Sequence, residues 1–342
     1  MRTIVLGGTR FIGRAVVDEL VEAGHDVLIV HRGEHEPGGL ADVPHVHAHR
    51  RDLVGCAGEL RGFAPDGVVD MCAMTRSDAD IALAALPDGP RLLAVSSINV
   101  YRACSSVWAG TVTDAVPLTE DSAVRDVPLP DDGVMDGYDY DPAEYDNLDV
   151  EAAYLARGAT VCRLPVVYGP HDFKRREDFV LRRVRARRRR LPVGAGGFLC
   201  SRGYAPELAR GIRLALEHPS AAGEVFNLCE AQCAPVRLWT EQIIAFAHAD
   251  LALVRVPDAA LPEDLKITGD IAQPWLTSPA KAHAVLDWVH RDASDCVRES
   301  VGWHLRHPPD IGDAGFDADD RALALAATDV HRGGVWPEHG GG

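Results

Sequence analysis

The chain has 342 residues, of which 46% are hydrophobic, and it carries a formal net charge of −16. This length suits one large domain or two closely packed ones, and the negative charge disfavours generic binding to nucleic acids or anionic membranes. No apolar run reaches the roughly 18 residues of a membrane span and the N-terminus lacks a signal-peptide layout, so we expect a cytoplasmic protein with eight reduced cysteines.

The first 30 residues predict a strand, a glycine turn, a helix and a second strand. Thr3–Leu6 is a short apolar run typical of a buried strand, and residues 26–30 form a similar run after the helical pattern. Gly7 and Gly13 lie six residues apart, and Arg10 occupies the middle glycine position of a dinucleotide-binding fingerprint. The turn would expose backbone N–H groups at a helix N-terminus, where a nucleotide pyrophosphate binds.

The segment Gly-Gly-Thr-Arg-Phe-Ile-Gly at 7–13 resembles the start of an atypical branch of the extended short-chain dehydrogenase/reductases. These form the NAD-dependent epimerase/dehydratase family, and the branch includes chloroplast stem-loop RNA-binding proteins. The resemblance extends from Met1 to about residue 306. It implies that the turn binds the cofactor through Gly7, Thr9, Arg10, Phe11, Ile12 and Gly13.

The end of the second strand favours NADP over NAD. An NAD site normally carries an acid here, which holds the ribose 2′-OH. This chain has His31 and Arg32 instead. Arg32 and Arg10 could together bind a 2′-phosphate, because a guanidinium group pairs well with phosphate. NAD remains the alternative, with both arginines simply solvated.

Histidines alternate along 45–49, as in a half-exposed third strand. His45, His47 and His49 could bind a metal on one face or could form the solvent side of the strand, and we assign no metal site. In related proteins an acid after this strand approaches the adenine. His49 occupies that position, and we assign Asp52, three residues later, to the cofactor.

Two further strands should end at the cofactor. Residues 67–73 place Ala73 at a strand end that faces it. Residues 91–97 run into Tyr101, and this Ser-Ser-x-x-Val-Tyr pattern resembles the catalytic serine segment of the family. The resemblance implies that Ser97 binds the reacting oxygen and that Tyr101 lies near the substrate. The alternative is an ordinary strand that ends in serine.

The segment Arg-Leu-Pro-Val-Val-Tyr-Gly-Pro at 163–170 closely resembles a family segment whose backbone passes the nicotinamide. It implies cofactor contacts from Pro165 and Val166 and a substrate contact from Tyr168. The preceding stretch, 120–151, is rich in Asp and Glu, and we expect a surface loop that is either a solvated acidic loop or a lid over the site.

The usual catalytic Tyr-x-x-x-Lys pair of the family is absent. The three lysines are Lys174, Lys266 and Lys281, and none follows a tyrosine by four residues. A register that starts from Tyr145 places Asp149 in the lysine position. A register fixed by Glu151 places Asn147 there and Ala143 in the tyrosine position. We expect Tyr145 to be the general acid/base with Asn147 beside it, and we expect no strong lowering of its phenol pKa.

A basic helix is predicted within residues 174–190, which hold ten Lys or Arg and two acids, a net charge of +8. Arg182 and, further on, Arg202 could hold substrate phosphates. A nucleic-acid surface and a charged outer helix face are the alternatives. Phe179 is the single aromatic residue of the run, which disfavours nucleic acid because base stacking uses aromatic side chains.

Together these patterns predict an α/β protein with a Rossmann-type doubly wound parallel sheet and a smaller C-terminal α+β lobe. We expect an NADP-binding domain at 1–170, rejoined by about 200–230, a substrate lobe at 171–306, and an acidic, glycine-rich tail at 307–342. The family resemblance implies an oxidoreductase or epimerase that acts on a nucleotide-linked sugar or a natural-product intermediate, and Arg10 and Arg32 favour NADP as its cofactor. The alternative is a catalytically degenerate cofactor-binding protein with a sensory or RNA-associated role. We expect a small-molecule partner, no membrane, no general nucleic-acid binding, and a homodimer as one option for assembly.

Overall fold

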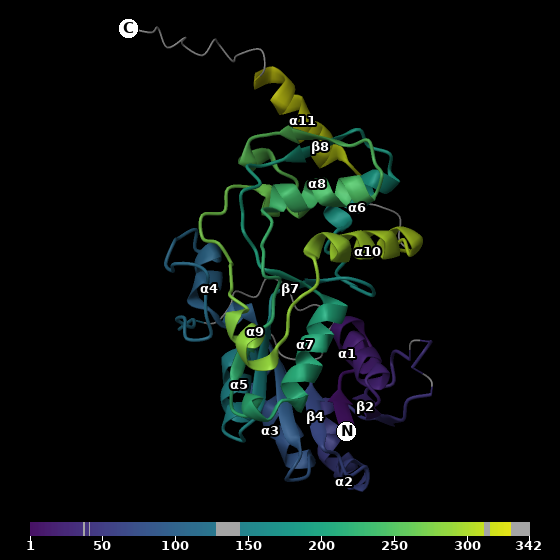
Figure 1. Cartoon of the computed structure of the whole chain (residues 1–342). Coiled ribbons are helices and arrows are strands. Elements are labelled where there is room, and N and C mark those ends of the chain that lie inside the picture. Colours follow the sequence, from purple (N-terminus) through teal and green to yellow (C-terminus); the bar gives the residue numbers. More distant parts are fainter. Residues whose placement is uncertain (37, 41, 128–143, 311–314, 330–342) are drawn as a thin grey trace.

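The computed structural model describes residues 1–36, 38–40, 42–127, 144–310 and 315–329, and its centre is a seven-stranded parallel sheet (Figure 1). The strands of the sheet are β1 (Arg2–Leu6), β2 (Asp26–His31), β3 (His45–His47), β4 (Gly67–Asp70), β5 (Arg91–Ser97), β6 (Thr160–Leu164) and β10 (Val225–Asn227). Their order is β10-β6-β5-β4-β1-β2-β3, and every neighbouring pair is parallel. The strand order reverses between β1 and β4, which confirms the predicted doubly wound fold.

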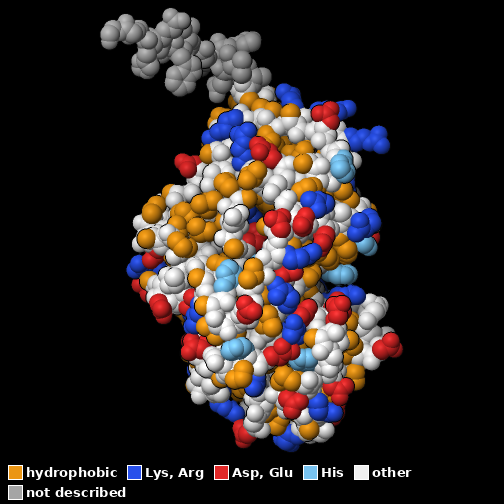
Figure 2. Space-filling model, in the orientation of Figure 1, with side chains coloured by type: hydrophobic (Ala, Val, Ile, Leu, Met, Phe, Trp, Pro, Cys, Tyr) orange, Lys and Arg blue, Asp and Glu red, His pale blue; other side chains and the backbone are white. Residues whose placement is uncertain are grey.

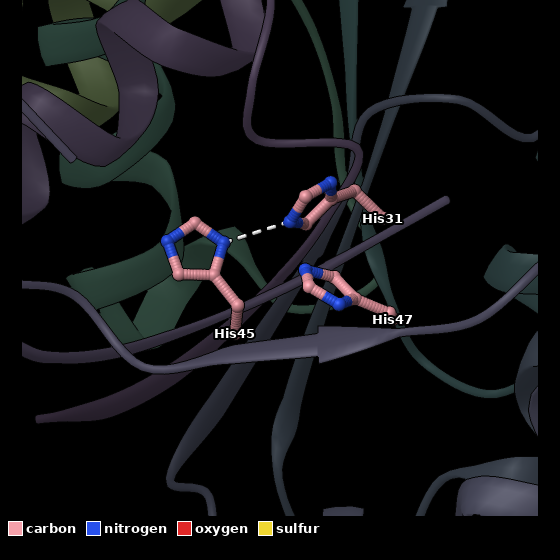
Figure 3. Close-up of side chains that lie close together, drawn as sticks. All are labelled: His31, His45 and His47. Carbon is pink, nitrogen blue, oxygen red and sulfur yellow. Dashed lines mark hydrogen bonds between the residues drawn. The ribbon is translucent and has the colours of Figure 1, made fainter. Parts of the chain in front are cut away.

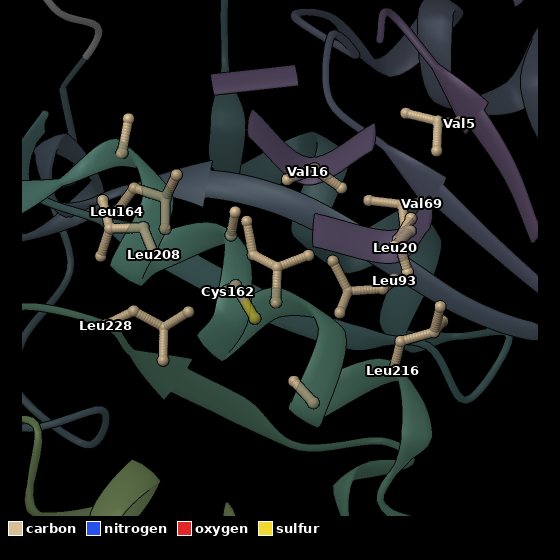
Figure 4. Close-up of a cluster of buried hydrophobic side chains, with 14 of the residues drawn as sticks. Val5, Val16, Leu20, Val69, Leu93, Cys162, Leu164, Leu208, Leu216 and Leu228 are labelled. Atoms are coloured by element: carbon tan, nitrogen blue, oxygen red, sulfur yellow. The ribbon is translucent and has the colours of Figure 1, made fainter. Parts of the chain in front are cut away.

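One face of the sheet is covered by α1 (Phe11–Glu22), α7 (Ala205–Glu217) and α9 (Ala280–Leu286) (Figure 1). The side chains between these helices and the sheet form the largest apolar cluster of the described residues, part of which is drawn in Figure 4. Val5, Val69 and Leu93 come from three neighbouring strands and pack with Leu20 of α1 and Leu216 of α7. These five side chains are at most 3% exposed, so burial of apolar area holds both helices on the sheet.

The other face is covered by α2 (Ala57–Gly62), α3 (Arg76–Ala85) and α5 (Asn147–Leu155). Odd and even residues of β1 point to opposite faces, so Ile4 and Leu6 pack on this side while Val5 packs on the other. Both faces of the sheet are therefore buried, as a doubly wound parallel sheet requires.

A second lobe lies beyond the carboxyl ends of the strands (Figure 1). Its elements are β7 (Val166–Tyr168), α6 (Asp178–Arg185), β8 (Arg190–Val193), β9 (Arg202–Tyr204), α8 (Val236–Phe246), β11 (Ala252–Arg255), α10 (Ala293–Arg306) and α11 (Asp317–Asp329). The pairs β7–β9 and β8–β11 are parallel two-stranded sheets. The helix α4 (Arg102–Trp108) lies beside the main sheet, between β5 and β6 in the chain.

The segment predicted as a tail contains a packed helix. In α11, Ala322 and Leu323 are buried, and Asp319 is fully buried against Arg183 of α6. Two acids of this segment pair with the basic run, Asp319 with Arg183 and Asp320 with Arg188. The predicted acidic loop includes residues 128–143, which lie outside the described part of the chain, as do residues 330–342.

Candidate functional site

A cavity of about 210 Å³ opens at the carboxyl ends of β1, β2 and β4, where the strand order reverses. The turn between β1 and α1 forms one wall, and the ends of β2 and β4 form the others. Ligands bind at this position in open α/β sheets. The first turn of α1, at residues 11–13, lines the cavity, and the backbone N–H groups of a helix N-terminus favour an anionic ligand.

Two glycines of the turn are required by close contacts. Gly7 has φ +90°, and a Cβ atom there would lie 2.8 Å from the sulfur of Cys72. A Cβ atom at Gly13 would lie 2.1 Å from the carbonyl oxygen of Gly7. The turn and the start of α1 therefore pack too closely at these two positions to admit a side chain, as the glycines of a dinucleotide-binding turn do.

The structure brings most of the predicted cofactor residues to this cavity. It is lined by Gly7, Thr9, Arg10, Phe11, Ile12, Gly13 and Arg32. Within the described chain, the other predicted residues are not part of its lining: Asp52 is exposed, Ala73 and Pro165 are buried, and Val166 is half-buried.

Arg10 has a clear role in place of the usual glycine. Its guanidinium carbon lies 4.5 Å from the ring centre of Phe173, and this ring also contacts Phe11 edge to face at 6.2 Å. Phe173 comes from the segment between β7 and α6, so the contact joins the cofactor turn to the second lobe across the mouth of the cavity. Sequence reasoning did not single out Phe173, because the fold alone brings it there.

The end of β2 carries a neutral histidine and an arginine. Burial, followed by the nearby His45 and His47, lowers the pKa of His31 to about 4. His31 Nδ1 accepts a hydrogen bond from the Gly33 N–H at 3.1 Å, so the ring proton is on Nε2, which lies 2.7 Å from His45 Nδ1. Both nitrogens of His31 are thus engaged by protein groups. Arg32 pairs with Glu34 at 2.9 Å, and both line the cavity.

A charged network that the sequence did not reveal lies under the cavity. Arg50 donates two hydrogen bonds of 2.6 Å to the carboxylate of Asp70, which also accepts from the phenol of Tyr154. Burial alone would raise the pKa of Asp70, but the adjacent Arg50 outweighs burial and lowers it. Arg50 also lies 2.9 Å from the sulfur of Cys72. Both Arg50 and Cys72 line the cavity, so this ion pair fixes the end of β4 at the cavity wall.

The predicted catalytic residues form a second cluster at the end of β5. Val95 lines the cavity, and Ser97 follows two residues later on the same face of the strand. Asn99 donates from its side-chain amide to the Tyr145 oxygen at 2.8 Å, and Asn147 donates to the same oxygen at 3.0 Å. Ser97 Oγ accepts from the Asn99 N–H at 3.3 Å, so one asparagine connects the serine to the phenol.

The structure resolves how Tyr145 and Asn147 meet although they are only two residues apart. Within a helix, two residues that are two positions apart point to nearly opposite sides. Helix α5 begins at Asn147 with Asp146 as its N-cap, so Tyr145 lies before the helix and its side chain can meet that of Asn147. Asn147 is buried, one turn before Glu151 on the same side of the helix. Ala143 lies outside the described residues.

The environment of Tyr145 does not favour a free phenolate. Burial raises its pKa, and the amide groups of Asn99 and Asn147 and the charge of Arg125 oppose that rise without overcoming it. Arg125 is itself paired with Asp146 at 2.5 Å, so its charge is largely compensated. The raised pKa of Tyr145 agrees with the expectation that the pKa of this phenol is not strongly lowered.

Glu151 holds α5 against the sheet through a buried network. Its carboxylate accepts from Ser96 at 2.6 Å and from Arg163 at 2.7 and 3.0 Å. Arg163 also donates to the phenol of Tyr101 at 3.0 Å, and Tyr101 donates to Asn227 at 2.7 Å. Tyr101 is therefore fully buried with its phenol paired to protein groups, and its predicted substrate contact stays a prediction.

The other residues predicted to contact the substrate also pair with protein groups. Tyr168 is buried and donates to Glu230 at 2.8 Å. Arg202 is 3% exposed, stacks over Trp239 and donates to the carbonyl of Ala234. Arg182 pairs with Asp264 at 2.8 Å. All three side chains therefore have protein partners in this structure, and their predicted substrate contacts stay predictions.

The basic run of residues 174–190 is largely neutralised by acids of the same molecule. Arg183 lies between Asp264 and Asp319, with bonds of 2.7 Å to each, and Arg185 pairs with Asp178 at 3.0 Å. On the face that Figure 2 shows, blue and red side chains are interspersed. This favours the charged-helix alternative over a continuous nucleic-acid surface.

Known proteins resemble this chain in both sequence and fold. The model of the NAD dependent epimerase/dehydratase family matches residues 3–229. The chain is 26% identical over 243 residues to the chloroplast stem-loop binding protein of 41 kDa b of Arabidopsis thaliana, which covers 66% of this chain and 58% of that protein. It is 29% identical over 121 residues to 2′-dehydrokanamycin reductase of Streptomyces kanamyceticus. This match covers 35% of this chain and 34% of that protein. The matches thus span less than two thirds of either curated relative.

Two solved structures share the fold at low sequence identity. A UDP-glucose-4-epimerase from Stenotrophomonas maltophila, with bound NAD and formylated UDP-arabinopyranose, superposes with a TM-score of 0.69 at 18% identity over 90% of this chain and 98% of that one. A dTDP-glucose 4,6-dehydratase from Bacillus anthracis, in complex with NAD, superposes with a TM-score of 0.66 at 16% sequence identity. The match covers 90% of this chain and 97% of that one. Among the residues that the structure describes, no helix has the length and apolarity needed to cross a membrane.

Proposed function

The chain belongs to the NAD-dependent epimerase/dehydratase family, and we propose that it is an NADP-dependent oxidoreductase or epimerase with an unusual acid/base. The observation that carries this proposal is the pairing of the glycine-walled cavity with the Ser97–Asn99–Tyr145–Asn147 cluster at the same edge of the sheet. The substrate class we propose is a nucleotide-linked sugar or a related natural-product intermediate. Its support is the family, the sugar-nucleotide enzymes that share the fold, and a relative named as a reductase.

The residues of the cavity suit a dinucleotide. The glycine turn at 7–13 forms one wall of the cavity, and the start of α1 supplies N–H donors for a pyrophosphate. The nicotinamide, when bound, supplies the hydride acceptor or donor. Ser97 would hold the reacting substrate oxygen, and Tyr145 would accept or return its proton.

Cofactor preference depends on Arg32 and its neighbours. His31 replaces the usual acid and has both nitrogens engaged, so it is poorly suited to hold a ribose hydroxyl. Arg32 could turn from Glu34 to a 2′-phosphate, with Arg10 on the other side of the turn. Glu34 is the competing feature, because a carboxylate in the same wall could hold the 2′-OH of NAD instead.

Calorimetry with NADPH and NADH tests this preference. We expect tighter binding of NADPH, and Arg32→Ala should weaken NADPH by roughly 1.5–3 kcal/mol while leaving NADH nearly unchanged. Arg51→Ala is the matched control, since Arg51 is exposed and does not line the cavity. Equal affinities, or a Glu34→Gln change that weakens only NADH, would show an NAD site.

Turnover of Ser97 and Tyr145 variants tests the chemistry. With candidate sugar nucleotides, Tyr145→Phe should lower kcat by about 10²–10⁴-fold, and wild-type turnover should rise toward alkaline pH. If Ser97→Ala is inactive while Tyr145→Phe retains wild-type turnover, another group exchanges the proton.

The alternative is a cofactor-binding protein with little catalysis and an RNA-associated role. It rests on the name of the Arabidopsis relative, and the pairing of Arg183 and Arg185 with acids weighs against it. RNA binding at low salt that falls steeply with added salt, together with absent turnover, would favour this alternative over the enzyme.

A further inference from the structure

We propose that His31, His45 and His47 form a binding site for a divalent transition-metal ion at the outer edge of the sheet, beside the proposed cofactor cavity. Alternation along β3 puts His45 and His47 on one face. The parallel register pairs His31 with His47 across β2 and β3, which places His31 on that same face. Two adjacent strands therefore hold three imidazoles in a fixed arrangement, and a ligand atom of each lies within 4.8 Å of the others.

The three rings face one another (Figure 3). His31 and His47 stand edge to face with ring centres 4.8 Å apart, and His31 and His45 do so at 4.9 Å. A tetrahedral zinc ion with Zn–N bonds of about 2.1 Å needs ligand nitrogens about 3.4 Å apart. Small side-chain rotations reach that spacing, because the His31–His45 nitrogens are now 2.7 Å apart and the whole set lies within 4.8 Å.

His45 is already in the form that binds a metal. Its Nε2 lies 3.0 Å from the carbonyl oxygen of Leu40, so Nε2 carries the proton and donates it. Its Nδ1 therefore presents a lone pair, which now accepts the hydrogen bond from His31. An imidazole whose second nitrogen donates to a backbone carbonyl is typical of metal-binding histidines.

An acid stands next to the third histidine. Glu36 Oε1 lies 2.6 Å from His47 Nε2. This carboxylate could complete the site as a fourth ligand or stay hydrogen-bonded beside it. Imidazole nitrogens with one carboxylate suit Zn²⁺ and its neighbours rather than Ca²⁺ or Mg²⁺, which prefer oxygen ligands.

His31 would link the metal to the cavity. To bind through Nε2, it must shift its proton to Nδ1, and Nδ1 can then no longer accept the Gly33 N–H. Gly33 has φ +82° and follows Arg32 directly, so the turn that carries Arg32 should rearrange. A dication here also adds positive charge beside the wall that contains His31 and Arg32. We therefore expect metal binding to strengthen NADPH binding, a consequence that rests on the proposed function, whereas the metal site itself does not.

Titration of reduced, chelator-treated protein with Zn²⁺ tests the site. Calorimetry should show one ion bound by the wild type, and His45→Gln and His47→Gln should each weaken that event at least tenfold. His35→Gln is the matched control, because His35 is exposed in the same segment and outside the cluster. Co²⁺ should give the visible absorption of a four-coordinate ion, lost in His45→Gln. Zinc binding unchanged in both variants, or weakened equally in the control, would overturn the site, and so would a six-coordinate cobalt spectrum in the wild type.

NADPH titrations with and without Zn²⁺ test the coupling. We expect NADPH affinity to rise at least fivefold with zinc in the wild type and not in His47→Gln, with a reciprocal gain in zinc affinity. Zinc binding without this gain would overturn the coupling alone. Zinc binding by a protein with no affinity for NADPH or NADH would overturn the proposed function and leave the metal site standing.

Discussion

Glu177 offers a test of the buried electrostatics of the second lobe. Its side chain is fully buried at the start of α6, where one carboxylate oxygen accepts from Ser300 and the other lies 3.4 Å from His304 Nε2. Burial raises the pKa of Glu177 to about 7 from 4.5. Burial also lowers the pKa of His304 to about 4 from 6.5. Both groups are thus held neutral near pH 6.

The change we consider is Glu177→Gln, which imitates the protonated acid. A raised pKa means that the folded protein holds the proton more tightly than the unfolded chain does. The resulting stability is fully present below pH 4.5 and is lost as pH rises through about 7. The difference between 7 and 4.5 corresponds to about 3 kcal/mol of stability lost by pH 8. His304 acts oppositely, since its contribution is present above pH 6.5 and is lost as pH falls toward 4.

Reversible urea unfolding of wild type and variant between pH 4.5 and 8.5 measures the effect. The free energy of unfolding of Glu177→Gln, relative to wild type, should rise by about 3 kcal/mol across this range. The difference cancels contributions common to both proteins, including that of His304. Glu241→Gln, an exposed change on α8, should show a flat difference. A flat difference for Glu177→Gln, or one that falls with pH, would refute the reasoning.

Two further predictions concern packing and charge. Gly13→Ala should abolish NADPH binding and lower the melting temperature, because its Cβ would lie 2.1 Å from a backbone oxygen. The control Gly58→Ala, which has open space around it in α2, should leave NADPH binding unchanged and leave stability unchanged or slightly raised. Normal NADPH binding by Gly13→Ala would contradict the close packing of the turn. Asp319→Asn should lower the free energy of unfolding in urea by about 3 kcal/mol, because it leaves the buried Arg183 with only Asp264. The exposed control Asp320→Asn should lower it by at most about 1 kcal/mol. Equal effects would show that α11 is not held by the buried pair.

Local patterns were sufficient to predict the fold. The apolar run before Gly7, the helical spacing after Gly13 and the repeated strand-then-helix alternation each reflect backbone geometry that needs only nearby residues. The position of Asn147 came instead from the family pattern through Glu151, which is buried and paired with Arg163, and the catalytic role of Asn147 stays a prediction.

Residues whose roles depend on distant partners could not be predicted in this way. Arg182 and Arg202 read as substrate ligands because the sequence shows their charge but not the groups that contact them. Arg50 was missed because its partner, Asp70, lies 20 residues away at the end of β4. The histidine cluster was only partly visible, since His45 and His47 alternate along one strand while His31 joins them across the sheet in place of His49.

The central claim, that Tyr145 is an acid/base without a lysine, is tested most directly by titrating its phenol. The ultraviolet titration of wild type minus Tyr145→Phe isolates this group. We predict a midpoint above the ordinary 10.0, because burial outweighs the amide donors of Asn99 and Asn147. Asn147→Lys should restore a nearby positive charge and lower the midpoint by about one to three pH units. A wild-type midpoint well below 10.0, or one that Asn147→Lys does not move, would contradict the account.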